Sequence, residues 1–289
     1  MIIDSHQHIW DPTKAEYSWL TRDLAPIDRP ILFPEFITKM KSRNIGYTVL
    51  VQSADNLEDT QLMLDAASHN PQIIGVVAYL PLEDPIRTRE LASEYANYPI
   101  IAGVRNLIHT YPDPHWLLRG AVNESLSILV EFGLTFDVVS TLPEHLELLP
   151  SLGDSHPDLK MVIDHLSKPP IAEGINSPQA TAWRSMMSDA ARNPNVYAKI
   201  SGLYPGSAPM DWSSASIRPF IHEALEIFGS QRLMYGGDWP ISVLSGDYER
   251  VFDGLSDVIA ELSEADQKNI WSESAKNFYN LEISERQTS

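Results

Sequence analysis

The sequence predicts an α/β protein that folds as a (β/α)₈ TIM barrel and forms a single domain over residues 1–289. Short apolar, β-branched runs of strand length alternate with stretches of helical spacing along the whole chain. Successive runs start 26 to 46 residues apart, which leaves room for a crossover helix between parallel strands. Eight strand–helix units in 289 residues match the usual size of such a barrel, about 250 residues with additions.

The predicted strands are nearly continuous apolar runs, as parallel strands covered on both faces require. In chain order they are Met1–Ile3, Tyr47–Val51, Ile73–Leu80, Ile101–Ile108, Leu134–Val139, Lys160–Ile163, Val196–Ile200 and Arg232–Tyr235. Several helical stretches open with proline at the predicted first position, as at Pro34, Pro85 and Pro143. The alternative fold, an open doubly wound sheet, normally has a glycine-rich turn after its first strand, where this chain has His6-Gln7-His8.

Two segments are expected to lie outside the regular barrel. Residues 11–34 contain four prolines and Trp19, and a loop of this length is typical of an active-site cover, so we expect it over the barrel mouth. Residues 280–289 are expected to form a mobile tail. No Pro/Gly/Ser linker and no shift in composition divides the sequence into further domains.

Composition excludes several classes of function. The chain has 39 Asp and Glu against 21 Lys and Arg, a net charge of −18 that repels a phosphate backbone, so we expect no nucleic-acid partner. The absence of cysteine removes thiolate nucleophiles and sulfur ligands, so any metal needs His, Asp or Glu. No apolar run is long enough to cross a bilayer and the first residues do not resemble a signal peptide, which predicts a cytoplasmic protein without a membrane partner. Without GxGxxG, GxxxxGK or GxSxG, we expect neither a nucleotide cofactor nor a serine nucleophile.

Ionisable residues stand where the predicted strands end. Asp4, His6 and His8 alternate along the first strand and therefore point to one side. His165 follows the sixth strand and Asp238 follows the eighth. Because all strands of a closed barrel end at the same rim, we expect His6, His8, His165 and Asp238 to share one pocket. Paired imidazoles at this rim are typical of a metal or proton-transfer site.

Other polar residues fit the same rim, with structural salt bridges as an equal alternative for each. They are Gln52, Arg105, Asp137 and Lys199. Arg105 can hold a carboxyl or carbonyl oxygen through two hydrogen bonds, whereas Lys199 is predicted either to contact substrate or to neutralise Asp137.

Four motifs together resemble the amidohydrolase superfamily, and within it the lactonase branch of sugar, pyrone-dicarboxylate and sulfomuconolactone hydrolases. They are His6-Gln7-His8, Asp164-His165-Leu166-Ser167-Lys168-Pro169, Lys199-Ile200-Ser201-Gly202-Leu203 and Gly236-Gly237-Asp238-Trp239-Pro240. The resemblance runs from Ser5 to Trp239 and implies one amidohydrolase-type barrel domain over residues 1–289. It implies that Asp238 is the general base that takes a proton from the attacking water. It also implies that His6, His8 and His165 hold a metal, orient water or polarise the scissile carbonyl, and that Arg105 and Tyr204 contact substrate.

The sequence departs from the superfamily pattern at two strands. Many members carry a carboxylated lysine on strand four and a histidine on strand five, where this chain offers Arg105 and Asp137. We therefore expect no two-metal centre. We expect a site for one divalent metal, held by His6, His8 and Asp238 with or without His165. Zinc suits nitrogen and oxygen ligands of this kind. A site without metal is the alternative.

The expected reaction is hydrolysis of a lactone ring by water activated by Asp238. Free aspartate is a weak base, so either burial must raise the pKa of Asp238 or a metal must lower the pKa of the water. Few cations can be placed at the rim, which favours a neutral sugar-derived aldonolactone over a substrate with several carboxylates. Such a sugar is expected to contact Gln52, Asn106, Tyr204 and the aromatic face of Trp10.

Three other functions stay open. They are a metal-dependent decarboxylase of the same superfamily, a hydrolase of the pyrone-dicarboxylate or muconolactone type, and an inactive ligand-binding barrel. Met210, Trp212 and Phe220 are expected to close the barrel mouth or to pack a helix, with a homo-oligomer contact as the alternative. Surface or loop positions without a site role are expected for the remaining histidines, His69, His109, His115, His145, His156 and His222.

Overall fold

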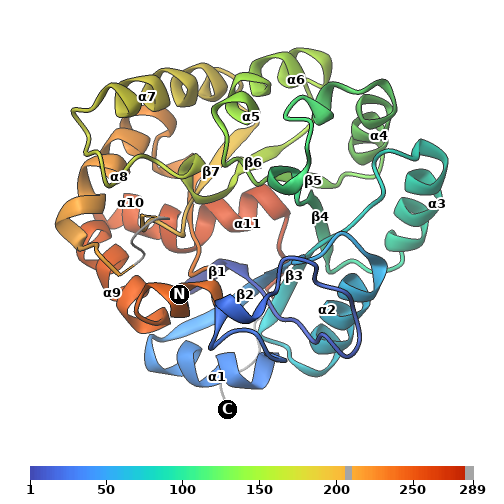
Figure 1. The fold of residues 1–289 in the computed structure, drawn as a ribbon, viewed down its shortest axis with the longest axis horizontal. Helices are drawn as coiled ribbons and strands as arrows, with labels where there is room; N and C mark the ends of the chain where they lie inside the picture. The colour runs from blue at the N-terminus through green and yellow to red at the C-terminus, as the bar shows by residue number, and fades with distance from the viewer. Residues whose placement is uncertain (206–209, 284–289) are drawn as a thin grey trace.

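The computed structural model describes residues 1–205 and 210–283 and confirms the predicted (β/α)₈ barrel. Eight parallel strands pair in sequence order from β1 to β8, and helices surround them (Figure 1). The ring closes between the last strand and the first, where Gln7 pairs with Trp239. The strands are β1 (Ile2–Gln7), β2 (Ile45–Val51), β3 (Ile73–Ala78), β4 (Ile101–Asn106), β5 (Thr135–Val138), β6 (Met161–Ile163), β7 (Val196–Ile200) and β8 (Leu233–Tyr235).

The helices form the outer layer and begin where local sequence favours them. Pro85 and Pro143 occupy the first helical position, as predicted, whereas Pro34 occupies the second position of α1, which begins at Phe33. The helices are α1 (Phe33–Ser42), α2 (Leu57–His69), α3 (Pro85–Tyr95), α4 (Gly120–Glu131), α5 (Pro143–Glu147), α6 (Leu149–Ser155), α7 (Pro178–Ala191), α8 (Ser214–Phe228), α9 (Tyr248–Ile259), α10 (Glu264–Lys268) and α11 (Ser274–Tyr279). Short helical turns connect them: η1 (Arg22–Leu24), η2 (Ile108–Thr110), η3 (Trp116–Leu118), η4 (Asp164–Ser167), η5 (Ser230–Arg232), η6 (Ile241–Ser245) and η7 (Asn269–Glu273).

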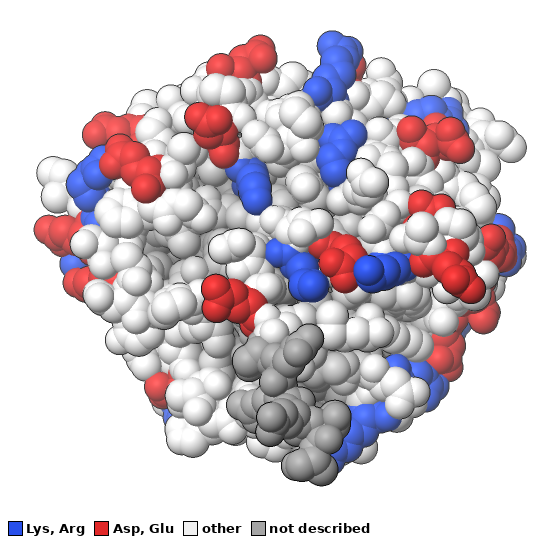
Figure 2. Space-filling model, turned by 180° about the vertical axis from the view of Figure 1, so that it is seen from behind, with Lys and Arg blue, Asp and Glu red and all other residues white. Residues whose placement is uncertain are grey.

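The barrel interior is filled by side chains and is closed at one end by the last helix. Apolar side chains such as Ile3, Val49 and Met234 form an inner cluster with Phe278 and Tyr279 of α11. Figure 1 shows α11 lying across the barrel, and Figure 2 shows the molecule from the opposite side, where acidic and basic side chains are interspersed. The site can therefore open only at the other end, where the strands terminate.

The segment 11–34 is attached to the carboxyl ends of β1 and β2. Trp10 exchanges backbone hydrogen bonds with Ile31, the Nε1 of Trp19 donates to the Ser53 carbonyl at 2.6 Å, and the Tyr17 hydroxyl donates to Asp59 at 2.8 Å. These contacts position Trp19 at the strand ends.

The expected tail, residues 280–289, falls partly outside the described residues, which end at residue 283. Within the described part, Leu281 is buried in the inner cluster. Among the described residues, no helix is both long enough and apolar enough to cross a membrane.

Gly237, between β8 and Asp238, leaves no room for a side chain. A Cβ at this position would overlap Tyr248 Cε2 and Asp4 Oδ2, both of which are buried. We expect Gly237→Ala to lower the free energy of unfolding by about 1–3 kcal/mol, measured by urea denaturation, because the packed neighbours must move. Gly120→Ala is the matched control, since a Cβ there meets no atom within 4 Å. Equal stability of the two variants would contradict this account.

Candidate active site

The junction of β1 and β8 brings the first histidines beside Asp238. Beyond the end of β8, the Asp238 amide donates to the His6 carbonyl at 2.9 Å and the His8 amide donates to the Trp239 carbonyl at 2.8 Å. Asp4 braces this junction by accepting from the Gly237 amide at 2.8 Å and from the His6 amide at 3.1 Å. Burial raises the pKa of Asp4 to about 6, with these hydrogen bonds acting in the opposite direction.

A left-handed turn after β6 delivers two further side chains. His165, Leu166, Ser167 and Lys168 all have positive φ, between 47° and 56°. Consecutive non-glycine residues in this region are costly, and such strain persists where surrounding structure enforces it, often at functional sites. Here the Trp183 indole donates to the Leu166 carbonyl at 2.8 Å and holds the turn.

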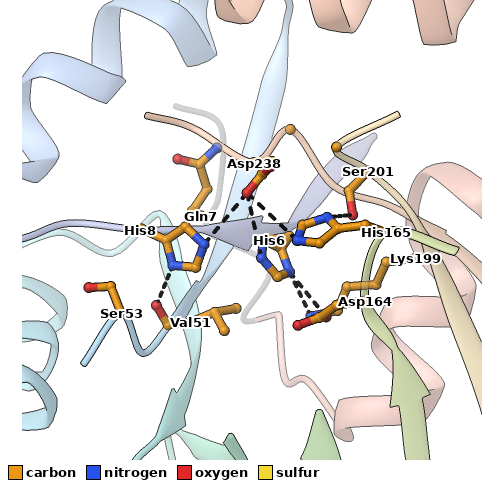
Figure 3. A network of polar contacts seen from close by, with 12 residues as sticks. His6, Gln7, His8, Val51, Ser53, Asp164, His165, Lys199, Ser201 and Asp238 are labelled. Atoms are coloured by element: carbon orange, nitrogen blue, oxygen red, sulfur yellow. Dashed lines mark hydrogen bonds and ion pairs between the residues drawn. The ribbon is translucent and has the colours of Figure 1, made fainter. Parts of the chain in front are cut away.

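The four residues predicted to meet do lie together (Figure 3). Asp238 Oδ1 is 3.6 Å from His8 Nε2, 3.7 Å from His6 Nε2 and 4.0 Å from His165 Nε2. All four residues are at most 7% exposed. The second carboxylate oxygen of Asp238 accepts from the Tyr204 hydroxyl at 2.7 Å. The site is therefore a buried carboxylate facing three imidazoles that come from opposite halves of the sequence.

Each imidazole is oriented by a different partner on its Nδ1 side (Figure 3). His8 Nδ1 lies 2.7 Å from the Val51 carbonyl, which only accepts, so this nitrogen carries a proton. His165 Nδ1 lies 2.9 Å from the Ser201 hydroxyl. His6 Nδ1 lies 3.0 Å from the Lys199 ammonium and 3.3 Å from Asp164 Oδ1.

The electrostatics differ from the expectation that burial raises the pKa of Asp238. Burial does act in that direction, but the opposing contributions of His165, His8 and His6 exceed it, and the pKa of Asp238 is lowered. Burial lowers the pKa of His165 to about 3 and also lowers the pKa of His6. At neutral pH the site therefore holds an ionised carboxylate beside neutral imidazoles of His6 and His165.

Under the imidazoles, buried charges neutralise one another. Asp164 Oδ2 accepts from Arg105 at 2.9 Å, and Lys199 lies 3.1 Å from Asp164 and 2.5 Å from Asp137. Burial raises the pKa of Asp164, but Lys199, His6 and Arg105 hold it well below its usual range. Lys199 is fully buried below the pocket, so the structure gives it the salt bridge to Asp137 that was the predicted alternative, in place of substrate contact.

The family follows from comparison with known proteins. The family model described as Amidohydrolase matches residues 3–281. The chain belongs to the amidohydrolase family. The resemblance inferred from the four motifs is thereby confirmed.

Relatives narrow the class of this amidohydrolase. The chain is 32% identical over 247 residues to an L-fucono-1,5-lactonase from Burkholderia ambifaria. This alignment covers 85% of this chain and 82% of the relative. It is 28% identical over 295 residues to an L-fucono-1,5-lactonase from Burkholderia multivorans, covering 96% of both chains. A solved amidohydrolase from Burkholderia multivorans with bound zinc has a TM-score of 0.86 at 25% identity, covering 98% of this chain and 100% of that one. These relatives agree with an enzyme of the hydrolase class, so the alternative of an inactive barrel is not retained.

The ligand atoms present in the amidohydrolase fit a single divalent metal. In the part of the chain that the structure describes, one set of potential ligands meets, and it consists of His6, His165 and Asp238, whose ligand atoms lie within 4.8 Å of one another. In addition, His8 Nε2 lies 3.6 Å from Asp238 Oδ1, beside this set of ligand atoms. Nitrogen and oxygen donors of this kind suit zinc.

A cavity of about 200 Å³ opens beside these residues. Of the predicted substrate contacts, Arg105 and Trp10 belong to its lining, although Trp10 is fully buried and its indole donates to the carbonyls of Ile27 and Arg29. Gln52 does not line it: its amide donates to Asp55 and to the Arg105 carbonyl. Tyr204 contacts the site by donating a hydrogen bond from its hydroxyl to Asp238.

Among the cavity residues to which sequence reasoning gave no site role are Trp19, His109 and Lys168. Lys168 stands three residues after His165 in a quoted motif, but only the left-handed turn shows that both side chains face the same space. Trp19 belongs to the segment 11–34, which was predicted to cover the barrel mouth, and this position could have indicated that Trp19 lines the cavity. His109 was expected to have no site role, and the turn after β4 instead brings it to the rim.

Other expectations about individual residues are corrected. His145 and His156 are 1% and 5% exposed, so they pack within the helical layer and are not surface residues. Phe220 is buried against Trp183, as the expected packing of a helix predicts, and the Trp212 indole donates to the Ser245 carbonyl. Of the three residues considered for an oligomer contact, Met210 alone is exposed.

Gly202, after β7, generates a prediction about the site. Its φ is +54°, and a Cβ would lie 2.7 Å from His165 Nδ1 and 2.9 Å from Asp238 Oδ2. We expect Gly202→Ala to lower kcat/KM about 100-fold, measured with the substrate of this hydrolase, because small displacements of reacting groups are costly. Gly174→Ala is the control, since Gly174 also has positive φ but its Cβ would meet no atom within 4 Å. A comparable loss in both variants would show that backbone strain, rather than contact with the site, is responsible.

Proposed function

We propose that this amidohydrolase opens the ring of a sugar-derived aldonolactone by hydrolysis, with Asp238 as the proton acceptor. The observation that carries the proposal is the Asp238 carboxylate, held within 3.6–4.0 Å of three imidazole nitrogens at the edge of a small cavity. The two L-fucono-1,5-lactonase relatives support a lactone as the substrate.

In the proposed reaction Asp238 takes a proton from water as the water oxygen bonds to the lactone carbonyl carbon. The bond between that carbon and the ring oxygen then breaks. The proton held by Asp238 passes to the ring oxygen, which leaves as a hydroxyl group, so water and lactone give one open-chain hydroxy acid. Because the neighbouring imidazoles lower the pKa of Asp238, the carboxylate is a weak base, and stabilisation of the developing oxyanion must supply more of the rate.

Lys168 is the proposed cation for a substrate oxygen. An ammonium has three N–H groups. The Gly202 carbonyl accepts one of them at 3.3 Å, and the ammonium lies 5.0 Å from the centre of the Tyr204 ring. Arg105 also lines the cavity, but its guanidinium donates to Asp164 and to the Gln52 carbonyl. Among the described residues that line the cavity, Lys168 is the one Lys or Arg without a carboxylate partner, and a single such cation suits a neutral sugar lactone better than a substrate with several carboxylates.

We propose zinc as the resident metal, held by His6, His165 and Asp238, with His8 facing the same carboxylate oxygen. This set differs from the predicted trio by including His165 in place of His8. A divalent cation bound there would polarise the lactone carbonyl and lower the pKa of a water molecule. The bound zinc of the solved relative supports this choice.

The function is tested with a panel of aldonolactones monitored by acid release with a pH indicator. We expect at least one sugar lactone to be hydrolysed, and Asp238→Asn to reduce kcat about 10²- to 10⁴-fold with an unchanged melting temperature. Asp158→Asn, at an exposed carboxylate, is the control for the loss of one negative charge. Carbon dioxide release without acid release would favour the decarboxylase, preferred turnover of dicarboxylate lactones would favour the pyrone-dicarboxylate type, and near-normal activity of Asp238→Asn would remove Asp238 from the mechanism.

The metal site is tested by calorimetric titration of chelator-treated protein with zinc, together with elemental analysis. We expect one zinc per chain and an affinity at least tenfold lower in His165→Gln, which removes one ligand. His109→Gln is the matched control, because His109 lines the cavity outside the ligand set. Failure of the wild-type protein to bind zinc would overturn this assignment.

A further inference from the structure

Two cavities of the molecule share one wall. The cavity of about 200 Å³ beside Asp238 is the catalytic cavity. A second cavity of about 630 Å³, which we call the outer cavity, is bordered by residues of the segment 11–34 and by the turn that follows β2. Trp19 and Leu107 line both cavities. These two side chains, here called the wall, therefore stand between the reacting groups and a larger space outside them.

The indole ring of Trp19 is fixed by two contacts. Its Nε1 donates to the Ser53 carbonyl at 2.6 Å. Its ring meets the ring of Trp10 edge to face, with ring centres 5.1 Å apart, and Trp10 itself is fully buried. Because a hydrogen bond and an aromatic contact together fix the orientation of the ring, Trp19 is a permanent part of the cavity lining.

The turn after β2 anchors both halves of the wall. Asn56 Nδ2 donates to the carbonyl of Glu16, three residues before Trp19, at 2.8 Å. Asp55 Oδ1 accepts from the amide of Leu107 at 3.0 Å, and the Leu107 side chain is buried. The wall is therefore tied to the barrel from both sides.

The catalytic cavity is small for a ligand site. Pockets for drug-sized ligands have volumes of about 300–1,000 Å³, and the volume of the catalytic cavity lies below this range. A lactone made from one sugar suits a cavity of this size, whereas a lactone that carries a second sugar needs more room. The outer cavity has that room, but the wall separates it from Asp238.

The lining of the outer cavity suits a sugar. Its polar side chains are those of Lys14, Glu16, Asp55, Asn56, Glu58 and Thr110. Carboxylates, amides and hydroxyls form hydrogen bonds with sugar hydroxyl groups, and an indole adds apolar surface. Three carboxylates against one ammonium disfavour an anionic group. The space beyond the wall therefore matches a neutral group rich in hydroxyls.

We propose that Trp19 is a specificity-determining residue that, together with Leu107, limits the substrate to the lactone of a single sugar. This inference rests on the proposed function, since it concerns the size of the lactone that reaches Asp238. A second sugar on the lactone ring would have to occupy the position of the indole. Removal of the indole joins the catalytic cavity to the outer cavity, which then receives the second sugar.

The kinetic test compares the preferred single-sugar lactone with the same lactone carrying a glucosyl group on its 4-hydroxyl. In the wild-type protein we expect kcat/KM to be at least about 100-fold lower for the larger lactone, because a fixed wall excludes the second sugar. Trp19→Ala is expected to narrow this ratio at least about tenfold. Trp19→Phe keeps a ring in the wall but loses the hydrogen bond to Ser53, so we expect its ratio to stay within about threefold of the wild-type ratio.

Leu20→Ala is the matched control for loosening of the segment. Leu20 is the next residue, is half-buried and lines neither cavity, so its replacement is expected to leave the ratio unchanged. Equal turnover of both lactones by the wild-type protein, an unchanged ratio in Trp19→Ala, or an equal narrowing in Leu20→Ala would each overturn the proposal. If Trp19→Ala does not fold, Trp19→Leu, which keeps an apolar group against Trp10, decides by the same ratio.

A measurement without turnover separates this inference from the proposed function. In a crystal structure of Trp19→Ala we expect one continuous cavity that reaches from Asp238 to Glu58. Two separate cavities in the variant, closed by a neighbour that moves into the vacated space, would overturn the inference. If no single-sugar lactone is hydrolysed, the proposed function fails, while this crystal structure still decides whether Trp19 divides the two cavities.

Discussion

The closure of the barrel between β8 and β1 is the constraint on which the site depends. Few ladder hydrogen bonds join these two strands, and the junction is completed beyond the end of β8, by the bonds between Asp238 and His6 and between His8 and Trp239. A carboxylate from residue 238 and imidazoles from residues 6 and 8 therefore meet as neighbours. Asp4 is the brace, because its buried carboxylate binds the amides on both sides of the junction. The contacts that close the ring are thus the same contacts that bring Asp238 beside His6 and His8.

The part of the barrel interior directly below the imidazoles is polar, although apolar side chains fill the interior next to α11. Arg105 and Lys199 balance Asp164 and Asp137, so the buried pairs carry no net charge although the whole protein carries −18. Breaking such a network by removing one partner is costly, since it leaves a buried charge without compensation. Two of its members, Lys199 and Asp164, lie beside the Nδ1 of His6.

Much of the fold and part of the site could be predicted from the sequence. All eight strands lie where short apolar runs stand between helical stretches, because apolar periodicity records burial on both faces of a parallel sheet. His6, His8, His165 and Asp238 could be placed together because parallel strands deliver their ends to one rim. The sequence could not predict that the Lys199 side chain points to Asp137, or that the pKa of Asp238 is lowered. Both depend on which charges lie within a few ångströms in three dimensions. Lys168 was missed for a related reason: its side chain reaches the cavity only because four non-glycine residues adopt a left-handed turn.

By itself, the sequence determined the barrel, the set of ionisable groups at its carboxyl-terminal rim and the resemblance to the amidohydrolases. These properties follow from local sequence patterns, which can be recognised without knowing where distant residues lie in space. Only the tertiary structure decided which nitrogen of each imidazole faces the carboxylate, which cation is committed to a salt bridge and which stays available to a substrate. Hydrogen bonding and charge interactions change sharply over one or two ångströms, and such separations between distant residues are written in no single segment of the chain.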